Sequence, residues 1–180
     1  YFAAARGYQG EKGDVKALAM KKWFNTNYHY MVPEIDDNTV LKLSDNKPFE
    51  LFTEALDNGV KTTPVIIGPY TFLELARYIG TKTKENFFGN ITDAYIQIIG
   101  KFVTLGAEWL QLDEPCLVKD MSREDIEFFN SLYTKILENK NGLKIRLQTY
   151  FGDVRDCYKE ICALDFDGIG LDFIEGKKTH

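Results

Sequence analysis

Short apolar runs alternate along this chain with longer stretches in which apolar residues recur every three or four positions. The short runs are typical of β-strands, and the longer stretches are typical of amphipathic helices. The predicted order is strand, helix, strand, helix, helix, strand, helix, strand, helix, strand. This alternation favours right-handed crossovers between parallel strands, so the predicted fold class is α/β.

The predicted strands are centred on residues 27–32, 65–67, 109–112, 145–147 and 169–171. The run at 65–67 is uninterrupted and is closed by Gly68-Pro69, which predicts a strand buried on both faces. Helices are predicted where capping signals flank a periodic pattern, as at the capping-box pairs Thr71/Glu74 and Ser122/Asp125. They cover residues 47–58, 71–79, 91–105, 123–137 and 154–162, with a short helix expected near residues 15–20.

Two folds satisfy this alternation, a (β/α)8 barrel and a doubly wound sheet. No Gly-x-Gly-x-x-Gly motif follows the first strand, which disfavours a dinucleotide-binding sheet. Five strands in 180 residues are too few for a closed barrel, which typically needs about 250 residues. The prediction is therefore a partial (β/α)8 TIM barrel with parallel strands. We expect its open edges to be covered by flanking chain or by a neighbouring molecule.

Composition and charge exclude several classes of protein. A net charge of −5 and a pI near 5.1 argue against a nucleic-acid partner, because phosphates require a basic face. No apolar run approaches the roughly 20 residues of a membrane span, and no signal peptide is recognised. Cys116, Cys157 and Cys162 have irregular spacing without a nearby histidine, which predicts buried or half-buried thiols, no zinc site and a cytoplasmic location.

Ligands in parallel α/β folds bind at the carboxyl ends of the strands. Polar residues at these predicted ends are Glu34, Asp113, Glu114, Gln148, Thr149, Tyr150 and Asp172. Because neighbouring residues of a strand point to opposite faces, Asp113 and Glu114 cannot both face a ligand unless the strand has already ended. Each fits either a general base or a loop-closing carboxylate that accepts backbone N–H bonds before Pro115, and the sequence leaves both open.

The stretch "MKKWFNTNYHYMVPE", residues 20–34, combines two lysines with an aromatic run. The aromatic residues predict a buried strand, and His29 within it is expected to be a hydrogen-bonded core residue. Lys21 and Lys22 fit either solvated side chains or the capture of an anionic tail, and composition alone favours solvated lysines. Packing roles are predicted for Trp23, Phe24, Tyr28 and Tyr30.

Four stretches resemble one family in the same order along the chain: "MKKWFNTNYHYMVPE", "PVIIGPYTFLELA", "GAEWLQLDEPCLV" and "LQTYF". They are similar to the N-terminal barrel of cobalamin-independent methionine synthases, which are also called 5-methyltetrahydropteroyltriglutamate–homocysteine methyltransferases. The resemblance implies that residues 1–180 are a fragment of that N-terminal barrel and that the catalytic C-terminal barrel is absent. It also implies methyl transfer from a polyglutamylated methylfolate to homocysteine, yielding methionine.

The resemblance assigns one site residue, Lys22, whose counterpart before Trp-Phe contacts the folate substrate. It places the catalytic zinc on the absent barrel, where it activates the homocysteine thiol, and it implies no cobalamin. Lys119 stands six residues after Asp113, where the catalytic barrel has an acid, so no catalytic residue is assigned. This portion is expected to be scaffold and part of the folate site, with no metal ligands and no activity alone.

Two other functions fit the residues without the resemblance. The first is a free-standing barrel hydrolase in which Asp113 and Glu114, or Glu34, act as an acid pair. The second is a non-catalytic binding module derived from a barrel. Neither requires a second barrel, so the presence of a following zinc-binding domain would favour the methyltransferase.

Overall fold

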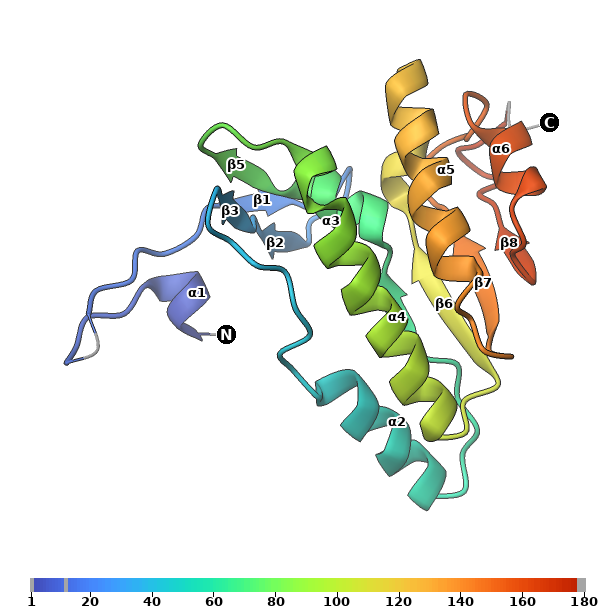
Figure 1. Ribbon diagram of the computed structural model, residues 1–180, viewed down its shortest axis with the longest axis horizontal. Coiled ribbons are helices and arrows are strands. Elements are labelled where there is room, and N and C mark those ends of the chain that lie inside the picture. The colour runs from blue at the N-terminus through green and yellow to red at the C-terminus, as the bar shows by residue number, and fades with distance from the viewer. Residues whose placement is uncertain (1, 12, 178–180) are drawn as a thin grey trace.

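The computed structural model describes residues 2–11 and 13–177. Its centre is a parallel four-stranded sheet with the strand order β4-β6-β7-β8 (Figure 1). The strands are β4 (Val65–Ile67), β6 (Trp109–Asp113), β7 (Lys144–Gln148) and β8 (Gly168–Gly170). This sheet confirms the predicted α/β class, although within the described residues it stays open, with β4 and β8 as its edges.

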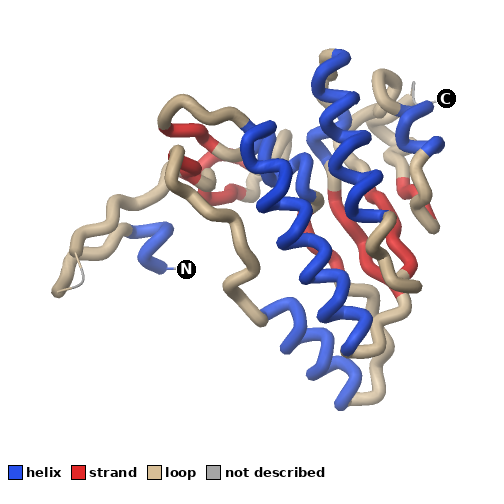
Figure 2. Tube along the Cα trace, in the orientation of Figure 1, coloured by secondary structure: helices blue, strands red, loops and turns tan. Residues whose placement is uncertain are grey.

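The two longest helices, α4 (Phe88–Thr104) and α5 (Arg123–Leu137), lie side by side over one face of this sheet (Figures 1 and 2). Leu110 and Leu112 of β6 alternate with half-buried residues and are fully buried beneath the helices. The predicted Ser122/Asp125 capping box is present at the start of α5, where the Ser122 hydroxyl oxygen accepts the Asp125 backbone N–H at 3.1 Å. Apolar periodicity therefore placed both helices correctly.

The remaining helices are shorter. They are α1 (Phe2–Arg6), α2 (Lys47–Asp57), α3 (Pro69–Leu75), α6 (Tyr158–Ala163) and the 3-10 turns η1 (Lys84–Phe87) and η2 (Pro115–Val118). The helix predicted over residues 71–79 is wrong at both ends. Gly68 occupies its N-cap, and Ala76 is extended with ψ 155°, so that residues 77–79 form a strand. The Glu74 side chain pairs with Lys84 instead of completing a capping box.

Four further strands form two small sheets beside the main one. They are β1 (Met20–Lys22), β2 (His29–Met31), β3 (Glu34–Asp36) and β5 (Arg77–Ile79). β1 pairs with β2 in an antiparallel hairpin, and β3 pairs with β5 in parallel. The strand predicted at 27–32 is present as β2, but it is one arm of an antiparallel hairpin and not a buried strand of the barrel. The helix expected near 15–20 is also wrong, since β1 begins there.

The second face of the main sheet is more open than predicted. Val65 and Ile67 are 53% and 41% exposed, so β4 is not buried on both faces. It is an edge strand whose only ladder partner in the described residues is β6. Whether flanking chain or a neighbouring molecule covers these side chains stays a prediction.

Candidate functional site

The carboxyl end of β6 directs two acidic side chains into different surroundings. Glu114 is fully buried, and its Oε1 accepts hydrogen bonds from the Tyr70 backbone N–H at 2.9 Å and the Tyr133 hydroxyl at 2.6 Å. Its Oε2 accepts the Thr71 backbone N–H at 2.7 Å. Burial raises the pKa of Glu114 to about 7, although these hydrogen bonds oppose the shift. Glu114 is therefore the loop-closing carboxylate, which ties the first turn of α3 to α5.

Asp113 belongs to a polar ladder on the opposite face of the sheet. Its Oδ1 accepts a hydrogen bond from Gln111 Nε2 at 2.8 Å, and its Oδ2 accepts one from the Tyr150 hydroxyl at 3.2 Å. Arg146 Nη2 in turn donates to Gln111 Oε1 at 2.6 Å. Both Asp113 oxygens thus have partners within the chain.

Five aromatic side chains join the β1–β2 hairpin to the end of β7. The Phe24 and Phe151 ring centroids lie 5.4 Å apart, and Trp23 lies 5.7 Å from Tyr30 and interacts with the Tyr150 side chain. Phe24 and Phe151 have φ of +52° and +74°, a left-handed conformation that bulky residues seldom adopt. Such backbone persists only where surrounding structure enforces it, and it is common at binding sites.

Beside these aromatic rings lies a cavity of about 280 Å³. We call it the lysine cavity; its lining residues are Lys21, Lys22, Phe24, Tyr30, Glu74, Leu75, Ala76 and Lys119. The first four come from the hairpin, the next three from the end of α3, and Lys119 follows η2. The structure thus places Lys22, the site residue predicted from the sequence, in the wall of this cavity. Lys119, to which the sequence assigned no function, lies in the same wall.

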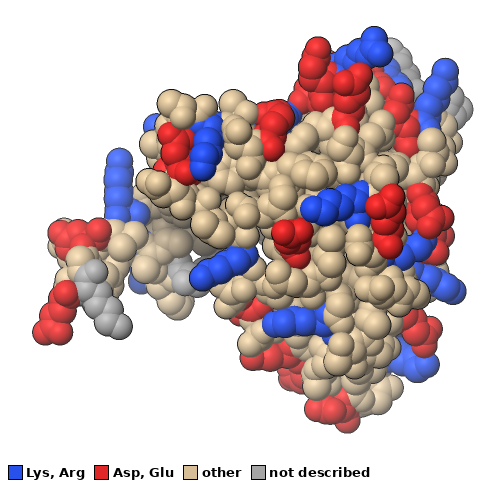
Figure 3. All heavy atoms as spheres, in the orientation of Figure 1, with Lys and Arg blue, Asp and Glu red and all other residues tan. Residues whose placement is uncertain are grey.

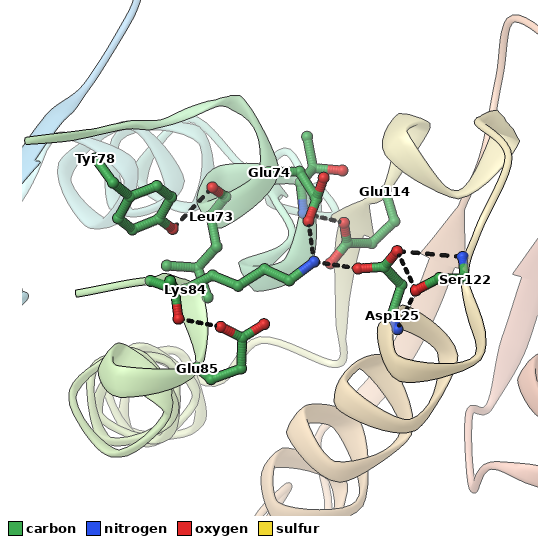
Figure 4. Close-up of polar contacts among 10 residues, drawn as sticks. Leu73, Glu74, Tyr78, Lys84, Glu85, Glu114, Ser122 and Asp125 are labelled. Atoms are coloured by element: carbon green, nitrogen blue, oxygen red, sulfur yellow. Dashed lines mark hydrogen bonds and ion pairs between the residues drawn. The ribbon is translucent and has the colours of Figure 1, made fainter. Parts of the chain in front are cut away.

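The lysine cavity carries an excess of positive charge. Within residues 2–11 and 13–177, no carboxylate lies within 4.0 Å of the amines of Lys21, Lys22 or Lys119. The acid in the cavity wall, Glu74, is already paired with Lys84 at 2.5 Å, and Lys84 also contacts Asp125 (Figure 4). Burial lowers the pKa of Lys84, but its bonds to Asp125 and Glu74 outweigh that effect and raise it.

Other parts of the surface offer less for an anion. A hollow of about 460 Å³ between α2 and α4 contains Lys101, whose amine is already hydrogen-bonded to Asn46 at 3.1 Å and lies 4.9 Å from the Phe49 ring centroid. On the face shown in Figure 3, acidic and basic side chains are scattered among larger uncharged areas. The lysine cavity is therefore the best candidate site in the described part of the chain.

Several predicted roles are corrected by the structure. His29 is exposed on β2 rather than buried in a core, and Tyr28 is 79% exposed. Cys162 is exposed, whereas Cys116 and Cys157 are buried as predicted. Glu34 lies in the β3–β5 sheet and faces Arg77 at 3.6 Å, so it does not share a sheet with Asp113.

The remaining strand-end candidates have structural partners. The Asp172 carboxylate accepts the backbone N–H groups of Phe151, Ile174 and Glu175 at 2.8–3.0 Å, and these bonds lower its pKa. Gln148 donates to the backbone carbonyl of Thr149 at 2.9 Å. These side chains close the loops around the aromatic cluster.

No group of three or more His, Cys, Asp or Glu side chains able to hold a metal ion is found among the residues that the structure describes. The zinc implied by the family resemblance therefore has no fitting donor set in this part of the chain. In the same residues, no helix is both long and apolar enough to cross a membrane.

The parallel sheet, with long helices on one face and a cavity beside its strand ends, defines an open, barrel-type α/β domain. The chain belongs to the family described as "Cobalamin-independent synthase, N-terminal domain", whose sequence profile matches residues 1–180.

Similar proteins are longer than this chain. It is 53% identical over 179 residues to a Streptococcus thermophilus protein, and 54% identical over 178 residues to one from Lactococcus lactis subsp. lactis. Both are named 5-methyltetrahydropteroyltriglutamate–homocysteine methyltransferase, and in each case the match covers 99% of this chain and 24% of the relative.

A solved structure from Listeria monocytogenes, provisionally assigned as a vitamin-B12-independent methionine synthase, superposes with a TM-score of 0.63. The superposition covers 74% of this chain and 46% of that structure, at 18% sequence identity. At this level of identity, the likeness supports the fold alone.

Proposed function

We propose that this chain is part of an enzyme that transfers a methyl group from 5-methyltetrahydropteroyltri-L-glutamate to L-homocysteine, giving L-methionine. The names of relatives that are 52–54% identical support the reaction. The chain would contribute scaffold and part of the folate site within an N-terminal barrel, and a second barrel would bind homocysteine and carry out the chemistry. A cytoplasmic location is part of the proposal, supported by the free thiols of Cys116, Cys157 and Cys162.

The observation that carries the proposal is Lys22 in the wall of the lysine cavity, with no acidic partner among the residues that the structure describes. A triglutamate tail carries several carboxylates, and a lysine ammonium is a compact charge that suits them. The pairing of Glu74 with Lys84 leaves the cavity lysines available for such an anion. We therefore propose that Lys22 binds the glutamyl tail.

The chemistry at sulfur would take place outside this chain. A bound zinc ion would ionise the homocysteine thiol at neutral pH, and the thiolate is the nucleophile. No group of side chains able to hold a metal ion is found among the described residues. In this proposal they hold and orient the methyl donor. No cobalamin is required, in keeping with the family description.

A hydrolase with paired strand-end acids fits the structure less well. Glu114 is fully buried and accepts hydrogen bonds from Tyr70, Thr71 and Tyr133, so it does not reach a substrate. Glu34 lies in a different sheet from Asp113. The arrangement of these carboxylates therefore argues against a hydrolase that uses them as an acid pair.

Replacing Lys22 by alanine in a full-length polypeptide that carries this chain tests the proposal. We expect KM for the triglutamylated methylfolate to rise about tenfold or more, because a charge-assisted contact contributes roughly 1.5–3 kcal/mol. Steady-state kinetics with the triglutamate as the varied substrate measures the effect. Lys61→Ala is the matched control. Lys61 is exposed and pairs with Glu108, and the two residues lie in the segments that precede β4 and β6. Unchanged KM and kcat in Lys22→Ala would show that Lys22 does not bind the glutamyl tail.

A further inference from the structure

We propose that Lys119 is a second, specificity-determining residue of the lysine cavity, where it binds a carboxylate of an oligoglutamyl tail together with Lys22. This inference rests on the proposed function. Lys119 directly follows η2, almost a hundred positions beyond Lys22 in the sequence, yet both side chains line the same hollow of about 280 Å³. The fold thus brings two cations from separate elements to one small space.

The Lys119 amine lies beside an aromatic ring. Its Nζ lies 5.8 Å from the centroid of Phe24, within the range of a cation–π contact. Phe24 is itself held by Trp23 and Phe151, at ring-centroid distances of 5.2 and 5.4 Å. A lysine that lies over an ordered ring loses less freedom when it binds a ligand than a fully mobile one.

The charge of Lys119 is not balanced by a neighbouring carboxylate among the described residues. No carboxylate of the described residues lies within 4.0 Å of its amine, and Glu74 is engaged by Lys84. Lys21, Lys22 and Lys119 line the same cavity, and a bound polyanion would offset their positive charges. Adding a negative charge to the ligand should consequently strengthen binding.

The apolar part of the wall indicates the kind of anion. Phe24, Tyr30, Leu75 and Ala76 contribute rings and short aliphatic groups beside the lysines. An oligoglutamyl chain presents carboxylates on short methylene spacers, which match this mixture better than an inorganic ion does. With two lysines on different elements, the cavity could bind more than one carboxylate, so it would distinguish a triglutamate from a monoglutamate.

Equilibrium binding to the full-length polypeptide tests this inference, with 5-methyltetrahydropteroyl monoglutamate and triglutamate as ligands. We expect Lys119→Ala to raise Kd for the triglutamate about tenfold and Kd for the monoglutamate less than twofold. Lys119→Arg keeps the charge and should retain most of the preference for the longer tail. Lys119→Glu should weaken triglutamate binding more than alanine does, and all these effects should shrink at high salt.

The controls separate this inference from the proposed function. Lys61→Ala should bind both ligands like the unmodified protein. If Lys22→Ala impairs triglutamate binding and Lys119→Ala does not, the proposed function stands and the role of Lys119 is refuted. If Lys119→Ala weakens both ligands equally, its role in reading tail length is refuted. If neither lysine variant changes binding, the tail does not occupy this cavity and both proposals fail.

Discussion

Glu114→Ala is expected to destabilise the domain by about 3 kcal/mol or more. The substitution removes the acceptor of two backbone N–H groups and of the Tyr133 hydroxyl, all in a fully buried place, and each orphaned donor costs about 1–3 kcal/mol. It also leaves a cavity at the junction of α3 and α5. Hydrogen exchange in the full-length polypeptide should show faster exchange at the amides of Tyr70 and Thr71.

Tyr133→Phe is the matched control for this prediction. It removes one donor and leaves Glu114 accepting both backbone N–H groups, so we expect a loss of about 1 kcal/mol. Protection of the Tyr70 and Thr71 amides should be largely retained. Equal losses in the two variants would show that the carboxylate does not stabilise α3.

The raised pKa of Glu114 also predicts a pH dependence. Because the folded-state pKa is about 7 and the unfolded value is about 4.5, the folded state binds more protons between these values. The stability contributed by this group is fully present below pH 4.5 and is lost as pH rises through 7, on the order of 3 kcal/mol in total. Glu114→Gln should remove this dependence when the unfolding free energy is measured from pH 5 to 8.

Gly68→Ala is expected to cost about 2–3 kcal/mol, for a reason unrelated to backbone strain. Gly68 has φ −75°, which any residue adopts, but an added Cβ would lie 2.2 Å from Glu114 Oε1 and 2.6 Å from its Cγ. Glu114 is buried and held by three hydrogen bonds, so it cannot move aside without losing them. Chemical denaturation measures the loss.

Gly100→Ala is the control for Gly68→Ala, and its expected effect on stability has the opposite sign. Gly100 lies inside α4, and an added Cβ would meet no atom within 4 Å. Because glycine costs about 1 kcal/mol relative to alanine in a helix, this change should stabilise the domain slightly. If both alanine variants behaved alike, the proposed clash at Gly68 would be wrong.

Local sequence signals placed the core of this fold well. The apolar periodicity of α4 and α5 and the Ser122/Asp125 capping box act within a few residues, so they can be read from one sequence. The strands β6 and β7 were also found, because Leu110, Leu112, Ile145 and Leu147 are fully buried side chains in short apolar runs. Their parallel pairing followed from the alternation with helices.

The wrong predictions concern residues whose burial depends on segments far away in the sequence. Residues 65–67 read as doubly buried, yet Val65 and Ile67 are exposed because β4 is an edge of the sheet. The aromatic run at 27–32 read as a core strand, but β2 pairs antiparallel with β1 and leaves His29 exposed. Composition cannot reveal which side of a strand another element will cover.

The candidate site was only partly predictable. Lys22 emerged from the family resemblance, since composition alone favoured a solvated lysine. Lys119 was missed because its relation to Phe24 is created by tertiary folding, and no spacing in the sequence encodes it. The alternative roles of Glu114 could be separated only when its hydrogen-bond partners on α3 and α5 were known.

A crystal structure of the full-length polypeptide with bound 5-methyltetrahydropteroyltriglutamate tests the central claim most directly. We predict a tail carboxylate about 3 Å from Lys22 Nζ, inside the cavity bounded by the β1–β2 hairpin, the end of α3 and Lys119. A bound ligand whose glutamyl tail runs elsewhere and leaves the lysine cavity without a carboxylate would contradict the claim.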